Sequence, residues 1–188
     1  MTIENNCINE LIINKSKFIT YLYKINSKED ILKILTNLKQ EYKDATHIVY
    51  AYILDNEVKY NDDNEPTGTS GFPILEVLKK NNLNHVICIC IRYFGGIKLG
   101  AGGLIRAYSN SCSLAIKKTT IVALEEKYKI KITFSYDLTS KIDNLINQSN
   151  IIEKSYQDDI TYYLIVNEDI KDKLALITKV EVLEKNYF

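Results

Sequence analysis

The stretch HVICICIRYFGGIKLGAGGLIRAY, residues 85–108, contains the change of pattern that organises the first half of the chain. Its first part, residues 85–94, is a nearly continuous apolar run, which is typical of a strand buried on both faces. A helix is predicted from about Gly102 to about Lys118. Its expected apolar positions are Leu104, Ala107, Tyr108, Leu114 and Ala115. The chain must therefore turn sharply between a buried strand and a helix.

The turn is rich in glycine and in positive charge. Residues 92–108 hold five of the seven glycines, which are Gly95, Gly96, Gly100, Gly102 and Gly103. They also hold three cations: Arg92, Lys98 and Arg106. Glycine permits positive φ and close backbone approach, and free N–H groups at a helix start favour an anion. If the loop folds back on the helix start, the three cations face one pocket. The pattern indicates a site for a phosphate, a nucleic-acid backbone or an acidic loop; close packing of the helix on a sheet explains the glycines equally well.

Two nucleotide-binding motifs begin in this segment and neither is complete. Gly95 and Gly100 have the spacing of a P-loop, but Ala101-Gly102 follows where Lys-Ser/Thr is required. A GxGxxG pattern starts at Gly100, and Ile105 stands at the third glycine. We therefore predict no cofactor.

An acidic loop, NDDNEPTGTSG at residues 61–71, precedes the buried strand. It places Asp62, Asp63 and Glu65 within four positions. Three interpretations stay open: carboxylates that cap nearby N–H groups, carboxylates that pair with the basic glycine segment or a partner, and ligands of a divalent cation. The spacing does not match an EF-hand loop.

His47 lies in a predicted strand of alternating pattern, residues 45–54. Such a histidine is more often a hydrogen-bonded structural residue than a catalytic one, and we include His47 among the candidate ligand-binding residues. His85 begins a strand and carries no further indication. The chain has two histidines and no GxSxG motif, which argues against a triad hydrolase.

The remaining pattern predicts an α+β protein of two domains, residues 1–123 and 124–188. Ser27 and Asp30 form a capping box before an amphipathic helix, and Asp55-Asn56 forms a hairpin turn. The first half contains strands 16–25, 45–54 and 57–60 and helices 28–42 and 72–83. The second half contains strands 127–138, 151–156, 160–167 and 180–188 and helices 139–150 and 168–179. Its β-α-β-β-α-β order is that of a ferredoxin-like domain.

Composition limits the possible classes of function. The formal net charge is +0, which argues against wholesale electrostatic binding to nucleic acid or membranes but leaves room for a local basic patch. No apolar run approaches the roughly 20 residues needed to cross a bilayer. The first residues do not have the pattern of a secretory signal. The four cysteines form no CxxC pair, and Cys88 and Cys90 share one strand face as expected core thiols. We expect a reduced, cytoplasmic protein that does not contact membranes.

Three blocks of the sequence resemble the YigZ/IMPACT family. They are ATHIVYAY (45–52), NDDNEPTGTSGFPIL (61–75) and RYFGGIKLGAGGLIRAY (92–108). Their order and spacing fit, and the resemblance covers most of residues 16–118. The second half resembles, in layout, the small C-terminal domain of bacterial members.

The acidic loop departs from the family at three positions. The family usually reads DDGEPSGTAG, so Asn64 replaces a glycine, Thr67 a serine and Ser70 an alanine. Asn is the residue that best tolerates the left-handed region after Gly. The substitution therefore predicts a positive φ at residue 64 and leaves the carboxylates in register.

The resemblance implies both a fold and a theme of function. It implies an N-terminal domain similar to the α+β domain shared by a small-subunit ribosomal protein, elongation factor G domain IV and the GHMP kinases. The C-terminal domain is similar to the ferredoxin-like end domains of that factor. Eukaryotic IMPACT proteins regulate translation, and bacterial members lack an established reaction. The resemblance thus implies a translation-linked or RNA-binding protein.

Three hypotheses of function follow from these observations. The first is a cytoplasmic regulator that binds RNA, the ribosome or a translation factor through Arg92, Lys98 and Arg106, with Tyr93 and Phe94 available to stack on a base. The second is an enzyme acting on a phosphorylated small molecule, with Asp62, Asp63 or Glu65 as a base or as a Mg²⁺ ligand. The third is a protein-interaction module. The oligomeric state does not follow from the sequence.

Overall fold

The computed structural model describes residues 1–187, with the side chains of residues 149 and 186 outside the description. The chain divides into two compact units, Met1–Ala123 and Leu124–Phe188. Each unit packs helices on an antiparallel sheet, so the α+β class is confirmed. The two units are described separately below.

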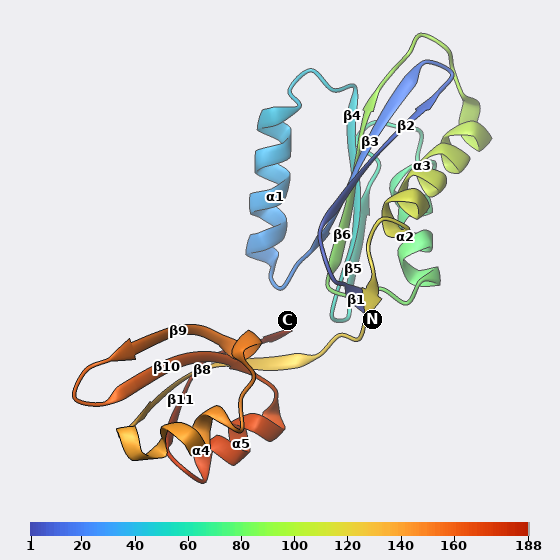
Figure 1. Cartoon of the computed structure of the whole chain (residues 1–188). Coiled ribbons are helices and arrows are strands. Elements are labelled where there is room, and N and C mark those ends of the chain that lie inside the picture. Colours follow the sequence, from blue (N-terminus) through green and yellow to red (C-terminus); the bar gives the residue numbers. More distant parts are fainter. Residues whose placement is uncertain (188) are drawn as a thin grey trace. The chain divides into compact units, whose positions relative to one another are not determined.

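The first unit is built on a five-stranded antiparallel sheet in the order β2-β3-β6-β4-β5 (Figure 1). The strands are β2 (Cys7–Ile13), β3 (Ser16–Lys24), β4 (His47–Leu54), β5 (Glu57–Asn61) and β6 (Val86–Tyr93). Two short strands, β1 (Thr2–Ile3) and β7 (Ile121–Val122), pair with each other and bring the two ends of this unit together.

Helices cover both faces of this sheet, which explains why its central strand is apolar throughout. Figure 1 shows α1 (Lys28–Glu41) on one face and α2 (Gly71–Lys80) and α3 (Gly100–Ile116) on the other. Along β6, Cys88 and Cys90 join the core under α2 and α3, and the isoleucines that alternate with them, Ile87, Ile89 and Ile91, join the core under α1. The cysteines are buried free thiols, and burial raises the pKa of Cys90 to about 12. The prediction of core thiols on a doubly buried strand is confirmed.

Local sequence chemistry sets several element boundaries as predicted. The Ser27 side chain accepts from the Asp30 N–H, and the Asp30 carboxylate accepts in return from the Ser27 N–H. Leu54 pairs with Glu57 across the Asp55-Asn56 turn. Helix α3 begins at Gly100, two residues before the expected start.

Strand β2 was not predicted, because some of its apolar side chains are exposed and one of its polar side chains is buried. Its side chains at Ile8 and Ile12 are 48% and 65% exposed, whereas Asn9 is buried. An apolar outer face and a polar inner position remove the alternation by which a half-buried edge strand is recognised. Pairing with β3, from Cys7–Leu22 to Ile13–Ser16, holds the segment in place.

The second unit is a four-stranded antiparallel sheet in the order β11-β8-β10-β9 with two helices. Its elements are β8 (Glu126–Phe134), α4 (Thr139–Asp143), β9 (Ile151–Tyr156), β10 (Ile160–Val166), α5 (Glu168–Ala175) and β11 (Lys179–Tyr187). The helix predicted over 139–150 was too long. Its last part is a 3₁₀ turn, Gln148–Asn150, because the Asn150 side chain accepts from the Asn147 N–H and competes with helical bonding.

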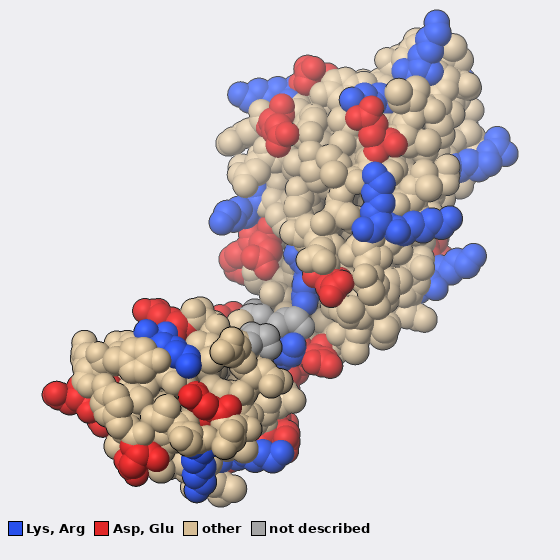
Figure 2. Space-filling view, viewed as in Figure 1, with Lys and Arg blue, Asp and Glu red and all other residues tan. Residues whose placement is uncertain are grey.

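Charge is dispersed over the surface that is visible in Figure 2. Acidic and basic side chains alternate over each unit and do not gather into one large patch of either sign, in keeping with the net charge of +0. Within residues 1–187, no helix is long and apolar enough to cross a membrane.

Candidate functional site

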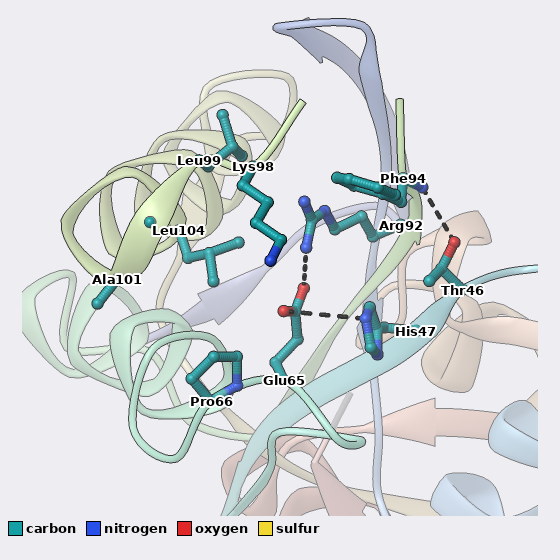
Figure 3. Close-up of a pocket in the computed structure, with 11 residues that line it drawn as sticks. Thr46, His47, Glu65, Pro66, Arg92, Phe94, Lys98, Leu99, Ala101 and Leu104 are labelled. Carbon is teal, nitrogen blue, oxygen red and sulfur yellow. Dashed lines mark hydrogen bonds and ion pairs between the residues drawn. The ribbon is translucent and has the colours of Figure 1, made fainter. Parts of the chain in front are cut away.

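The glycine segment and the acidic loop meet at a pocket on the face of the first sheet that carries α2 and α3 (Figure 3). The pocket has a volume of about 400 Å³. It lies where β4 begins, where β6 ends and where α3 starts. Its lining is Thr46, His47, Glu65, Pro66, Arg92, Phe94, Lys98, Leu99, Gly100, Ala101 and Leu104.

Arg92 forms the inner wall of the pocket. It pairs with Phe18 and His47 across the neighbouring strands and is only 5% exposed. Its guanidinium carbon lies 5.5 Å from the ring centroids of both Phe18 and Phe94. One amino group, Nη1, donates to Glu65 Oε1 over 2.6 Å, and Nη2 lies 3.4 Å from Ser16 Oγ. The buried Nε has no hydrogen-bond partner within the described part of the chain.

Glu65 is the acidic residue that compensates Arg92. It is 7% exposed, and its Oε1 accepts both from Arg92 Nη1 and, over 2.6 Å, from the hydroxyl of Tyr108 on α3. Burial raises the pKa of Tyr108 far above its usual range, and the hydrogen bond to Glu65 adds to this rise, so the phenol remains a donor. The pair of Glu65 and Arg92 therefore joins the acidic loop, the central strand and α3.

Asp62 and Asp63 have local roles. The Asp62 carboxylate accepts from the backbone N–H groups of Gly68, Ser70 and Gly71 and from the Ser70 hydroxyl. Asp63 Oδ2 accepts from the Ile48 N–H over 2.5 Å. The loop thus combines two of the three interpretations, backbone capping and pairing with the basic segment. Among residues 1–187 no group of three or more His, Cys, Asp or Glu side chains is placed to hold a metal.

Asn64 adopts the predicted left-handed conformation, with φ of 64°. Asp63 before it also has a positive φ, 43°. These two residues turn the chain so that Asp63 points back to β4 while Glu65 points to Arg92.

His47 is held by the same loop. Its Nδ1 lies 2.7 Å from the Asp63 carbonyl oxygen, and its Nε2 lies 3.9 Å from Glu65 Oε2 (Figure 3). A carbonyl oxygen only accepts hydrogen bonds, so Nδ1 carries the hydrogen and donates. The ring is thereby oriented with Nε2 toward Glu65 and the pocket.

Three glycines of the segment permit the turn between β6 and α3, through a close backbone contact or a positive φ. A Cβ at Gly95 would lie 2.0 Å from the carbonyl carbon of Lys15, so only glycine permits this approach between the β6 end and the β2–β3 hairpin. Gly96 and Gly100 have φ of 81° and 69°. Gly102 has open space around it, and neither a close contact nor a positive φ explains it. Close packing of a helix on the sheet, the structural alternative considered from the sequence, is therefore not the reason for Gly95, whose close contact is with the backbone of the β2–β3 turn.

The three cations do not share one pocket, which corrects the expectation from the sequence. Lys98 extends into the pocket toward Arg92 and Glu65 (Figure 3). Arg106 instead lines a separate hollow with Asn14 of the β2–β3 turn. Lys98 lies just before α3, and Arg106 lies within α3, eight positions later. The rotation of the helix over this distance directs the Arg106 side chain to a different side of the helix.

The aromatic residues are also divided between the two faces of the sheet. Phe94 lies at the pocket and is 45% exposed. Tyr93 packs with the core under α1 and donates to Asp44 over 2.9 Å, so it is not available to the pocket. Tyr108 was expected only as an apolar position of the helix; the need of a buried hydroxyl for a hydrogen-bond partner was the indication of its polar role.

Comparisons with known proteins agree with these structural features. The family model of the Impact N-terminal domain matches residues 14–116, more than half of the chain. The chain belongs to the IMPACT family. The IMPACT family member YvyE of Bacillus subtilis is 37% identical over 164 residues, covering 85% of this chain and 76% of the relative. The family member YigZ of Escherichia coli is 30% identical over 152 residues, covering 77% of this chain and 74% of the relative.

One solved structure extends the likeness to both units. The crystal structure of a hypothetical protein matches with a TM-score of 0.63 at 25% identity, covering 97% of this chain and 96% of that chain. The two-domain translational regulator Yih1 matches with a TM-score of 0.37 at 20% identity, over 62% of this chain and 46% of that one. A likeness as low as the second establishes neither a shared fold nor a shared function.

Proposed function

We propose that this IMPACT family protein is a binding protein linked to translation, which contacts RNA phosphates at the mouth of the Arg92–Lys98 pocket. The observation that carries the proposal is the convergence of Lys98 and the start of α3 on one concavity whose inner wall is Arg92. A cytoplasmic location is part of the same proposal.

The pocket has the electrostatic character of an anion site. Lys98 is exposed and has no acidic partner within 4.0 Å among the residues that the structure describes. Helix α3 has no acidic residue in its first turn, and Leu99 at its N-cap supplies no side-chain cap. The free N–H groups and the positive end of the helix dipole thus favour an anion next to Lys98.

RNA fits this site better than a free inorganic anion does. Phe94 offers a partly exposed ring, on which a base can stack while Lys98 contacts a phosphate. The translation theme comes from the family resemblance and from the fold that it implies. The β-α-β-β-α-β order and the strand order β11-β8-β10-β9 support a ferredoxin-like second domain, as that resemblance also implies.

The test is a titration of purified protein against bulk tRNA and against ribosomes over a series of salt concentrations. Because the overall charge is zero, we expect modest binding that weakens with salt. Lys98→Ala is expected to reduce the salt slope of log K by about 1, as for the loss of one phosphate contact. Lys33→Ala, which removes an exposed charge from α1 on the opposite face of the sheet, is the matched control. Absence of binding to both RNAs at low salt would contradict the proposal.

A second function is favoured by His47, whose Nε2 faces the pocket as a possible proton acceptor. An enzyme acting on a phosphorylated small molecule would use His47 as a base and Lys98 for the phosphate. A thermal-shift screen of phosphorylated metabolites distinguishes it, because such a substrate would stabilise the protein without RNA.

A further inference from the structure

Glu65 Oε2 and His47 Nε2 lie 3.9 Å apart in the pocket, and both atoms are hydrogen-bond acceptors when the His47 ring is neutral. The other carboxylate oxygen, Oε1, already accepts hydrogen bonds from Arg92 Nη1 and from the Tyr108 hydroxyl, each over 2.6 Å. No donor reaches Oε2 within hydrogen-bond distance from any residue that the structure describes. The Lys98 ammonium extends toward Glu65 but does not come within 4.0 Å of its carboxylate, so Oε2 has no bonded donor among the described residues.

The Asp63 carbonyl decides which ring nitrogen of a neutral His47 is the acceptor. Because the Asp63 carbonyl requires a hydrogen on Nδ1, a neutral ring presents a bare lone pair at Nε2. A lone pair that faces a carboxylate oxygen is unfavourable until a donor enters between them or beside both. Two adjacent hydroxyl groups, one for each acceptor, satisfy the corner without any change in the protein.

The neighbouring walls define what else the ligand carries. Lys98 and the start of α3 favour a negative group, and Phe94 offers the face of a ring. Adjacent hydroxyls next to a phosphate and a flat base are the chemistry of a ribonucleotide whose 2′ and 3′ positions are both free. The volume of about 400 Å³ is within the range of small-ligand sites, roughly 300–1,000 Å³.

We propose that the pocket receives the 3′-terminal nucleotide of an RNA, with its 2′,3′-diol donating to Glu65 and His47 and its phosphate on Lys98. This inference rests on the proposed RNA binding and makes it specific. Glu65 and Arg92 lie at the inner end of the pocket, with 7% and 5% of their surface exposed. Because they are so deeply placed, the terminal nucleotide of an RNA can reach them, whereas a nucleotide within a continuous RNA strand cannot. A free nucleoside 5′-monophosphate carries the same groups, and the test separates the two sources.

The experiment uses the full chain and a short single-stranded RNA that is labelled at its 5′ end. Two versions differ only in the last nucleotide, which carries either a 2′,3′-diol or a 2′,3′-dideoxy sugar. We expect the diol end to bind about tenfold or more tightly, because two acceptors are otherwise left without donors. Equal affinity of the two versions, with binding still dependent on Lys98, would overturn this inference and leave the proposed RNA binding intact.

Single substitutions test whether the preference for the diol end depends on His47 and Glu65. His47→Phe keeps a ring and removes Nε2, so the ratio of affinities for the two ends should fall toward one. Lys98→Ala should weaken both ends and keep the ratio. Because a substitution at His47 affects the acidic loop, circular dichroism and thermal melting must show that the His47→Phe protein is folded. Glu65→Gln is the second variant, and this substitution should also lower the ratio of affinities. A ratio that is unchanged in both folded variants overturns the assignment.

Competition with unlabelled nucleotides identifies the source of the ligand. AMP is expected to displace the labelled RNA only at concentrations far above that of an unlabelled RNA with a diol end. If AMP competes as well as the RNA does, the ligand is the free nucleotide, and the assignment to an RNA end is overturned. If no RNA binds at low salt, both this inference and the proposed function fail.

Discussion

Glu65 and Arg92, 27 positions apart in the chain, form a buried ion pair with 2.6 Å between Oε1 and Nη1. Through this pair the acidic loop and the glycine segment become one structure. The pair stands at the inner end of the pocket and has Tyr108 as a further donor to the same oxygen. It therefore connects the stability of the first unit with the shape of its candidate site.

Removing one partner should destabilise the first unit strongly. Glu65→Ala leaves the Arg92 guanidinium buried without its counter-charge, which costs about 3–5 kcal/mol in the free energy of unfolding. Urea denaturation followed by circular dichroism measures the loss. Glu10→Ala, which breaks the exposed pair of Glu10 and Lys17, should cost less than about 1 kcal/mol. Similar losses in the two variants would show that the buried pair is not important for stability.

Asp62 makes the stability of the acidic loop depend on pH. Burial raises the pKa of Asp62, but the hydrogen bonds from the Ser70 side chain and from the N–H groups of Gly68, Gly71 and Ser70 outweigh it, so the net pKa is lowered. A lowered pKa in the folded state means that the stabilisation is fully present above the ordinary value of 3.8 and is lost as pH falls through the folded value.

The comparison of wild type with Asp62→Asn measures this dependence. At pH 7 the variant should be about 1–2 kcal/mol less stable, because a charged acceptor of several N–H groups is lost. The difference between the two proteins should shrink as the pH is lowered below about 4. A difference that stays constant down to pH 3 would contradict the role of the ionised carboxylate.

Two glycines of the same segment should respond in opposite directions. Gly95→Ala places a Cβ 2.0 Å from the Lys15 carbonyl carbon, and the backbone must move, which costs at least about 2 kcal/mol. Gly102→Ala has free space in α3 and should leave stability unchanged or raise it by up to about 1 kcal/mol. Melting temperatures of the two variants provide the measurement. A loss of similar size at Gly102 would mean that its role is structural after all.

Asn64 tests the left-handed turn directly. Asn64→Gly should leave stability within about 0.5 kcal/mol, because glycine adopts a φ of 64° without strain. Asn64→Ala should cost about 1 kcal/mol, because a Cβ without a local hydrogen-bonding group is disfavoured in this region. Thermal unfolding of both variants measures this difference in stability. Equal stability of the Gly and Ala variants would contradict the argument.

Patterns within a few residues predicted much of the fold. The capping box of Ser27 and Asp30, the hairpin turn at Asp55-Asn56 and the positive φ at Asn64 all depend on neighbouring atoms, and all three are present. The doubly buried strand β6 was predicted because a long apolar run has to be covered on both faces. Strand β2 was not predicted, because its exposed isoleucines and buried Asn9 make sense only after β3 and α3 are in place.

Composition and spacing are enough to identify the candidate residues of the site, because glycines, cations and carboxylates are concentrated in two short segments. How these residues combine depends on the folding of the whole unit. It pairs Glu65 and Arg92 while keeping Asp62 and Asp63 for the backbone, and it sends Lys98 into the pocket and Arg106 to another hollow. These choices depend on strand register and helix rotation, which place side chains from distant parts of the chain within hydrogen-bond distance. No pattern of neighbouring residues contains that information.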